Sequence, residues 1–147
     1  SRELDICSMT ILIRCPLFVQ LHLSHYNLTV LGTNLESTME SFIPNEAEIG
    51  ADDLQTSIAI SDDIKRTTDA LIINPKAYQS DGCDKFLSQV ITPINIYTTI
   101  LVHGSRKTWV EFINQDKLPY PIDAYRQLIK QIHDAEWSDG TTKSQED

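Results

Sequence analysis

The sequence lacks any apolar run long enough to cross a membrane. A bilayer-spanning helix needs roughly 20 consecutive, mostly apolar residues. The longest apolar stretch, residues 11–23, is interrupted by Arg14, Pro16, Gln20 and His22. The opening residues, SRELDICSM, also lack the apolar centre of a signal peptide. We therefore expect this segment to make no membrane contact and to be cytoplasmic.

Cysteine is scarce and follows no recognisable spacing. The three residues, Cys7, Cys15 and Cys83, form neither a C-x-x-C pair nor a zinc-finger pattern. An odd, scattered set of this kind indicates reduced thiols rather than a disulfide framework. The sequence offers no other clear ligand set, so we expect no bound metal and no cofactor.

Basic residues are also few. The chain has 12 lysines and arginines against 21 acidic residues, for a formal net charge of −9. This balance repels a phosphate backbone, which excludes nucleic acid as a favoured partner. It favours solubility and a basic protein partner instead.

The remaining composition is that of an ordinary globular domain of 147 residues, with 41% hydrophobic side chains. We expect a lead-in over residues 1–9, one domain over residues 10–137 and a polar tail over residues 138–147. Within the domain, residues 44–63 contain six carboxylates and little periodic apolar signal. This segment is predicted to be an acidic, solvated loop, and a cation-attracting or partner-docking role is its alternative.

The hydrophobic pattern predicts strands alternating with helices. The expected strands cover residues 10–16, 27–34, 70–74 and 93–99, and the expected helices cover residues 17–26, 35–43, 81–90, a stretch between Gly104 and Ile113, and 122–137. Such alternation favours an α/β domain with a mainly parallel sheet. In these sheets, function gathers at the carboxyl ends of the strands. Those ends would carry Arg14, Cys15, Asn74, Thr98 and Tyr120.

Three stretches resemble the receiver domain of two-component response regulators. DALIINPKAYQSDG (69–82) is similar to the third receiver strand and its loop, TPINIYTT (92–99) to the fourth strand, and LPYPIDAYRQLI (118–129) to the last strand end and helix. The likeness covers roughly residues 10–133. It implies a flavodoxin-like sandwich of about five mainly parallel strands flanked by helices.

The resemblance also places degenerate residues at the phosphorylation site. Asn74 occupies the phosphate-acceptor position, Thr98 the switch position, and Tyr120 the position of the conserved lysine. Arg14 and Cys15 stand where receivers carry two acidic ligands for Mg²⁺, and neither side chain suits a hard cation. An amide is moreover too weak a nucleophile to form an acyl phosphate.

The resemblance therefore implies a receiver-like domain that is not an enzyme and cannot be phosphorylated. Its expected function is regulatory protein–protein interaction in signal transduction, within a hybrid histidine kinase or a clock-type protein. The expected partner is a kinase core, a phosphotransfer domain or another regulatory domain. The expected contact face comprises Tyr97, Arg106, Lys107, Trp109 and Tyr120.

Two alternatives remain open at this point. Asn27 and Asn74 echo polar positions of type II dehydroquinases, which are flavodoxin-like dehydratases, although the activated tyrosine of that family has no counterpart here. The chain could otherwise be a receiver that uses a non-standard acceptor.

The remaining candidates are isolated side chains. His22 and His25 are close enough in sequence to share a ligand, but no third ligand is evident. His103 and Ser105 suggest a base–nucleophile pair without the elbow motif that usually accompanies one. His133 is expected at the surface of the last helix. Cys15 is either a buried thiol or a redox-sensitive one.

Overall fold

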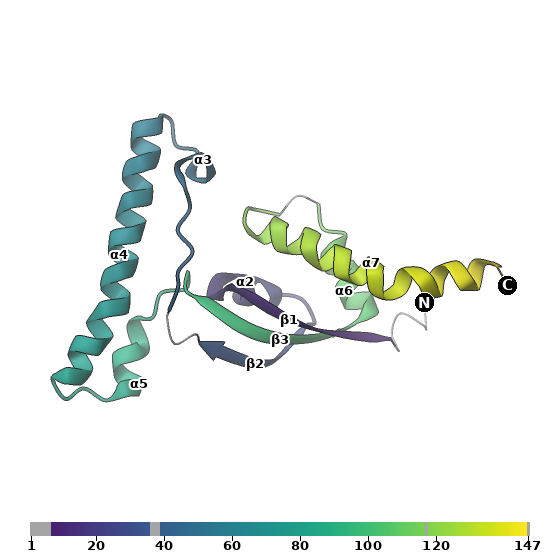
Figure 1. Ribbon diagram of the computed structural model, residues 1–147, viewed down its shortest axis with the longest axis horizontal. Helices are drawn as coiled ribbons and strands as arrows, with labels where there is room; N and C mark the ends of the chain where they lie inside the picture. The colour runs from purple at the N-terminus through teal and green to yellow at the C-terminus, as the bar shows by residue number, and fades with distance from the viewer. Residues whose placement is uncertain (1–6, 36–38, 117, 147) are drawn as a thin grey trace. The chain divides into compact units, whose positions relative to one another are not determined.

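The computed structural model describes residues 7–35, 39–116 and 118–146 (Figure 1). The elements follow one another as β1 (Ser8–Pro16), α2 (Leu17–Leu23), β2 (Thr29–Leu35), α3 (Glu46–Ile49), α4 (Leu54–Ser80), α5 (Lys85–Ser88), the 3₁₀ helix η1 (Gln89–Ile91), β3 (Tyr97–Ser105), α6 (Arg106–Ile113) and α7 (Ile122–Glu146).

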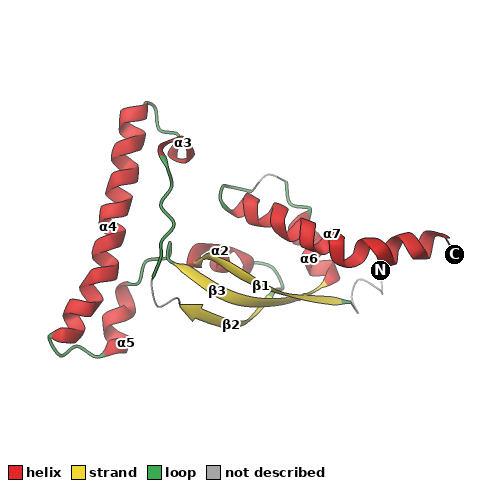
Figure 2. Cartoon of the chain, viewed as in Figure 1, coloured by secondary structure: helices red, strands yellow, loops and turns green. Residues whose placement is uncertain are grey.

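The three strands form one sheet in the order β1-β3-β2 (Figure 2). At the two ends of the β1–β3 pair, the Arg106 amide donates to the Cys7 carbonyl and the Leu17 amide donates to the Ile96 carbonyl. Residue numbers rise along one strand as they fall along the other, so the pair is antiparallel. The sheet is antiparallel throughout, and its two outer strands therefore run in the same direction on either side of β3.

Burial alternates along β1 and β3. In β1, Met9, Ile11, Ile13 and Cys15 are buried while the residues between them are exposed. In β3, Thr98, Ile100, Val102 and Gly104 are likewise the buried set. One face of these strands therefore belongs to the core, as expected for an antiparallel sheet with one solvated side.

The expected flavodoxin-like sandwich is wrong. The described residues form a three-stranded antiparallel sheet, not five mainly parallel strands. The alternation of strand and helix signals suggested parallel crossovers, but β3 pairs between β1 and β2 in the opposite direction. An alternating pattern of strands and helices does not determine the direction in which two strands pair.

The predicted secondary structure differs most from the observed one at α4, a helix of 27 residues. The loop predicted over residues 44–63 contains α3 and the first part of α4, and the strand predicted over residues 70–74 lies inside α4. Leu71, Ile72 and Ile73 form a short apolar run, which periodicity alone does not assign to strand or helix. Pro75 then suggested that no helix continues through this position, because proline usually ends or kinks a helix.

Local interactions nevertheless explain why α4 forms. The Asp53 carboxylate caps the helix by accepting the Thr56 amide at 2.7 Å. Farther along, Lys65 and Asp69 pair at 2.9 Å with the favourable i,i+4 spacing. Pro75 is buried in the unit that contains the helix, so tertiary packing offsets the backbone hydrogen bond it cannot make.

Other expectations are partly confirmed. The strands near residues 10–16 and 27–34 and the helices after residue 16, after Gly104 and from Ile122 are present as β1, β2, α2, α6 and α7. The helix expected over residues 81–90 is reduced to α5 and η1, and the strand expected over residues 93–99 begins only at Tyr97. The helix expected over residues 35–43 is wrong where it can be compared, since residues 39–43 are not helical; residues 36–38 lie outside the described residues.

The chain divides into two compact units. The first comprises residues 1–12, 21–32 and 101–147, and the second comprises residues 13–20 and 33–100. In the first unit, fully buried Trp109 donates its indole N–H to the Met9 carbonyl at 2.9 Å. Tyr26 meets Phe112 edge to face, with ring centroids 5.2 Å apart. These contacts fasten α6 to β1 and to the segment after α2.

In the second unit, one amide side chain joins three segments. Asn95, just before β3, donates through Nδ2 to the Phe42 carbonyl at 3.1 Å and to the Thr68 hydroxyl at 2.9 Å. Thr68 lies on α4 and is 4% exposed. Backbone bonds from the Phe42 amide to the Asn95 carbonyl and from the Tyr97 amide to the Glu40 carbonyl complete this connection.

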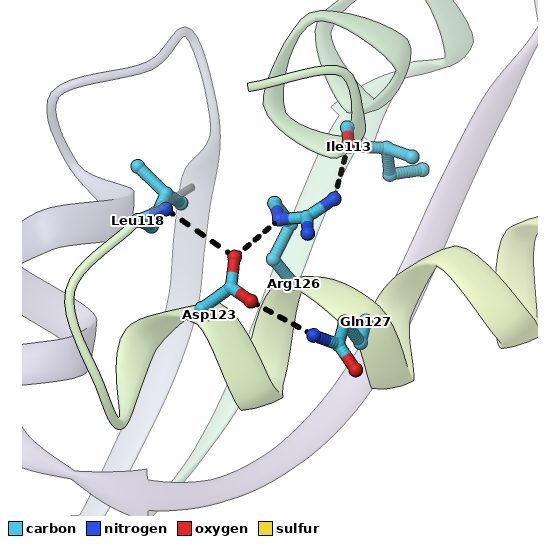
Figure 3. Close-up of polar contacts among 5 residues, drawn as sticks. All are labelled: Ile113, Leu118, Asp123, Arg126 and Gln127. Carbon is cyan, nitrogen blue, oxygen red and sulfur yellow. Dashed lines mark hydrogen bonds and ion pairs between the residues drawn. The ribbon is translucent and has the colours of Figure 1, made fainter. Parts of the chain in front are cut away.

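A polar network organises the start of α7 (Figure 3). Asp123 accepts hydrogen bonds from Arg126 at 2.7 Å, from Gln127 at 2.8 Å and from the Leu118 amide at 3.3 Å. Arg126 also donates to the Ile113 carbonyl at 2.9 Å, at the end of α6. The network therefore ties the α6–α7 connection to the first turns of α7, and it lowers the pKa of Asp123, chiefly through the Arg126 hydrogen bond.

We expect Trp109→Phe to destabilise the protein. The change leaves the buried Met9 carbonyl without its donor, which costs about 1–3 kcal/mol before the lost volume is counted. Urea denaturation followed by circular dichroism measures the effect. Leu128→Ala is the control, because Leu128 is 51% exposed and should change stability by about 0.5 kcal/mol or less. Equal midpoints for Trp109→Phe and the unmodified protein would contradict this assignment.

Asp123→Asn should weaken stability at neutral pH and change its acid dependence. The folded-state pKa of Asp123 is below the ordinary value of 3.8, so its stabilising contribution is full above 3.8 and is lost as pH falls through the folded value. Melting temperatures between about pH 3 and pH 7 should therefore converge for the variant and the unmodified protein at the acidic end. Asp116→Asn, at an exposed position, is the control. A constant difference at every pH would contradict the ionic origin of the effect.

Candidate functional site

The second unit contains a cavity of about 420 Å³, which is within the range of small-molecule sites. Ten residues line it: Met39, Leu71, Ile72, Pro75, Lys76, Gln79, Lys85, Gln89, Thr92 and Pro93. We call it the lysine cavity. Its wall combines apolar side chains with ammonium and amide groups, the mixture that binds an organic ligand and fixes its orientation.

Helical periodicity places half of this wall on α4. Leu71, Ile72, Pro75, Lys76 and Gln79 recur at the spacing of a single helix face. The opposite side comes from α5, η1 and the residues that follow them. α5 begins at its cap Asp84, whose carboxylate accepts the amides of Phe86 and Leu87.

A chain of hydrogen bonds connects the two sides. Gln79 donates through Nε2 to the Ser88 hydroxyl at 2.8 Å, and that hydroxyl donates to the Lys85 carbonyl at 2.7 Å. Ser88 is 2% exposed. With its nitrogen turned to Ser88, Gln79 keeps its carbonyl oxygen as an acceptor for another group.

The electrostatics of the lysine cavity differ from those of the whole chain. Its described lining includes Lys76 and Lys85 and no acidic residue, although the protein carries 21 acidic residues against 12 basic ones. A partly enclosed surface of one sign attracts ligands of the opposite sign. The cavity is therefore suited to an anionic ligand.

Met39 adds a conformational feature to the same wall. Its backbone φ is +45°, in the left-handed region that non-glycine residues seldom adopt. Such conformations are maintained by the surrounding structure and tend to occur at ligand sites. Among the described residues, Met39 is the non-glycine residue with this conformation, and it lines the cavity.

The five residues expected at the strand ends do not form one site. Arg14, on β1, lies 4.3 Å from the Tyr97 ring centroid and pairs with Glu40 at 2.7 Å. Cys15 is fully buried, and the Thr98 hydroxyl donates to its carbonyl at 3.4 Å. Arg14, Cys15 and Thr98 are thus brought near one another in the second unit, and none of the three lines the lysine cavity.

The other two strand-end residues are on different elements. Asn74 lies exposed on α4 rather than at a strand tip. Tyr120 is 61% exposed in the connection before α7, within the first unit. The arrangement that a receiver requires at one sheet edge is therefore not present among these residues.

The expected contact face is also divided between interior and surface. Trp109 is 0% exposed, so its side chain belongs to the core. Lys107 is exposed at the start of α6, and the Arg106 guanidinium carbon lies 4.9 Å from the Trp137 ring centroid.

The histidines do not gather into a metal site. His22 and His25 have ring centroids 6.0 Å apart, and burial together with the charge of His25 lowers the pKa of His22. His103 shares a 2.7 Å hydrogen bond with Thr10 rather than with Ser105. His133 is 8% exposed against α7's Trp137, not at the surface. Among the described residues, no group of three potential ligands could hold a metal ion.

The residues of the lysine cavity could not be predicted from the sequence as a group, because residues 75–80 were expected to form a loop. Once Pro75 is placed inside a helix, the spacing of Leu71, Pro75, Lys76 and Gln79 identifies a common face. Lys85 and Gln89 carried no comparable signal, because α5 is a single short turn.

Comparison with known proteins shows a likeness at the level of the fold. No family model matches the chain, and no curated protein matches it. A solved structure does match: the UMP/dUMP methylase PolB from Streptomyces cacaoi, determined with bound 5-Br dUMP, at a TM-score of 0.65 and 13% sequence identity. The chain has the fold of this methylase. The match covers 89% of this chain and 66% of the methylase chain.

This likeness corrects the functional expectations. The receiver resemblance is wrong, and so is the conclusion that the chain is a non-enzymatic, pseudo-receiver signalling domain, because the fold is that of an enzyme and the sheet is antiparallel. The dehydroquinase alternative fails for the same structural reason, since it also requires a flavodoxin-like sheet. Within the part of the chain that the structure describes, no helix is long and apolar enough to span a membrane.

We expect Cys15 to be unreactive in the folded protein. Burial raises the pKa of this thiol to about 12, which leaves almost no thiolate near neutral pH. Cys83 is exposed. Iodoacetamide labelling followed by peptide mass spectrometry should modify Cys83 at least about a hundredfold faster than Cys15, whose labelling requires opening of the core.

Guanidinium should abolish that difference, and Cys83→Ser should remove the fast reaction. Labelling of Cys15 at the rate of Cys83 in the native protein would contradict the buried assignment and revive a redox role.

Proposed function

We propose that the chain is the nucleotide-recognising part of an enzyme that methylates a pyrimidine nucleotide. The observation that carries this proposal is the lysine cavity, a site of ligand size with two ammonium groups and no carboxylate in its described lining. The fold likeness to a UMP/dUMP methylase supports the same class of substrate.

The phosphate and the base of a nucleoside monophosphate have suitable counterparts in this wall. Lys76 and Lys85 supply charge for the phosphate. Gln79 and Gln89 offer amide groups for the polar edge of the base, and Leu71, Ile72 and Pro93 offer apolar surface for its ring. The hydrogen bond from Gln79 to Ser88 limits the rotation of that amide, so its acceptor is oriented before a ligand arrives.

The described lining contains no histidine, cysteine, aspartate or glutamate. Apart from lysine, these are the usual side chains for general acid–base or nucleophilic catalysis, and we give the two lysines of the lining to the phosphate. We therefore assign the lysine cavity to recognition and orientation of the nucleotide, and not to activation of the carbon that receives the methyl group.

Titration with UMP should perturb the backbone amides that surround the lysine cavity, as measured by ¹⁵N–¹H NMR. Lys76→Gln and Lys85→Gln should each weaken UMP binding by about tenfold, because each removes a charge-assisted contact to phosphate. Uridine, which lacks the phosphate, should bind more weakly than UMP, and UMP affinity should fall as salt increases.

Lys130→Gln is the matched control, since Lys130 is an exposed lysine on α7 in the first unit. It should change UMP affinity by less than about twofold. If both cavity variants bind UMP as well as this control, or if UMP and uridine bind equally, the proposed function is wrong.

A further inference from the structure

The second unit has another cavity, of about 690 Å³, whose chemistry is opposite to that of the lysine cavity. Its lining consists of Phe18, Phe42, Pro44, Asp63, Ile64, Thr67, Thr68, Pro93, Ile94 and Asn95. We call it the phenylalanine cavity. Pro93 lines both cavities, and α4 contributes residues to both, so the two are neighbours along one helix.

The apolar part of the phenylalanine cavity is suited to a flat ring. Phe18 and Phe42 meet edge to face, with centroids 5.9 Å apart and an interplanar angle of 68°. Two prolines and two isoleucines extend this surface. Aromatic rings prefer such edge and offset contacts, which add to the favourable burial of their area.

Charge excludes an anionic occupant. The described lining contains one carboxylate, that of Asp63, and no lysine or arginine. Arg66 pairs with Asp63 at 3.2 Å, but both side chains are largely exposed, so this pair is strongly screened. A phosphate-bearing ligand would find no countercharge in the lining and is not expected here.

The hydrogen bonds of Asn95 identify the polar group that a ligand should carry. The Phe42 carbonyl can only accept, so the atom of Asn95 that faces it must be the amide nitrogen. The same nitrogen donates to the Thr68 hydroxyl, so both of its hydrogens are used. The carbonyl oxygen of Asn95 is the group left for a ligand, and it requires an N–H or O–H donor.

We propose that the phenylalanine cavity is a binding site for an uncharged aromatic ring that carries an N–H donor. The Phe18–Phe42 pair packs against the ring, and the carbonyl of Asn95 accepts its N–H. This site stands on its own residues and does not depend on nucleotide binding in the lysine cavity.

Indole is the direct probe, and 1-methylindole is its matched control because it has the same ring without the N–H. In ¹⁵N–¹H NMR titrations of the full chain, indole should cause saturable shifts at Phe42, Ile64, Thr67, Thr68, Ile94 and Asn95. We expect 1-methylindole to bind at least about fivefold more weakly, since it leaves the Asn95 oxygen unpaired. Inorganic phosphate should not shift this set.

Ile94→Glu should weaken indole binding by at least about tenfold by placing a charge against the ring. Ile94 is 56% exposed, so the variant should fold. Ile73→Glu is the control, because Ile73 is 61% exposed in the same unit and lines neither cavity. It should leave the affinity within about twofold.

The absence of saturable shifts at these residues would overturn the proposal. So would equal binding of the two indoles, or equal losses from the two glutamate variants. None of these outcomes bears on UMP binding, which is followed at the lysine cavity, so the failure of one proposal is distinguishable from the failure of the other.

Discussion

The side-chain amide of Asn95 is the interaction on which the second unit depends. It connects the segment at Phe42, the middle of α4 at Thr68 and the approach to β3. Because these bonds are partly removed from water, an apolar residue at this position would leave the Phe42 carbonyl without this donor and would lower stability. The same segments supply the walls of both cavities, so the geometry of the binding surfaces follows from this connection.

α4 contributes residues to two cavities whose linings differ in charge and polarity. α4 presents Lys76 and Gln79 near its carboxyl end and Ile64, Thr67 and Thr68 nearer its middle. The first group contributes to a cationic wall, and the second contributes to an uncharged, apolar one. Although Pro93 lines both cavities, a charged ligand and a neutral ring would use different polar groups, so both could occupy the unit together.

Much of the local structure could be predicted from the sequence, whereas the architecture could not. β1 was predictable from a short apolar run that Pro16 ends, and α7 from an apolar stripe at helical spacing. α4 was not, because Pro75 and the short run Leu71–Ile73 imitate the end of a strand. Strand direction was missed because alternating elements favour parallel crossovers only on average, and the place of β3 between β1 and β2 depends on contacts distant in sequence.

The candidate sites were harder still to foresee. Lys76 and Lys85 are ordinary surface residues in the sequence, and they become a site only when α4 and α5 face each other across Gln79 and Ser88. Asn74, by contrast, drew attention through a short resemblance that the fold does not support. The short motif around Asn74 predicted the wrong fold. The hydrogen bonds of Asn95, which do organise the second unit, cannot be predicted from any local sequence pattern.

We propose that the second unit holds two distinct, adjoining ligand sites. A competition titration tests it most directly: indole is added to protein already saturated with UMP, and the amide shifts of both cavities are followed by NMR. Two separate sites predict that the UMP-induced shifts persist while the indole-induced shifts develop on top of them, with an indole affinity within about threefold of that for the free protein. Progressive reversal of the UMP shifts as indole saturates would mean that the two ligands share one site, and the claim would be wrong.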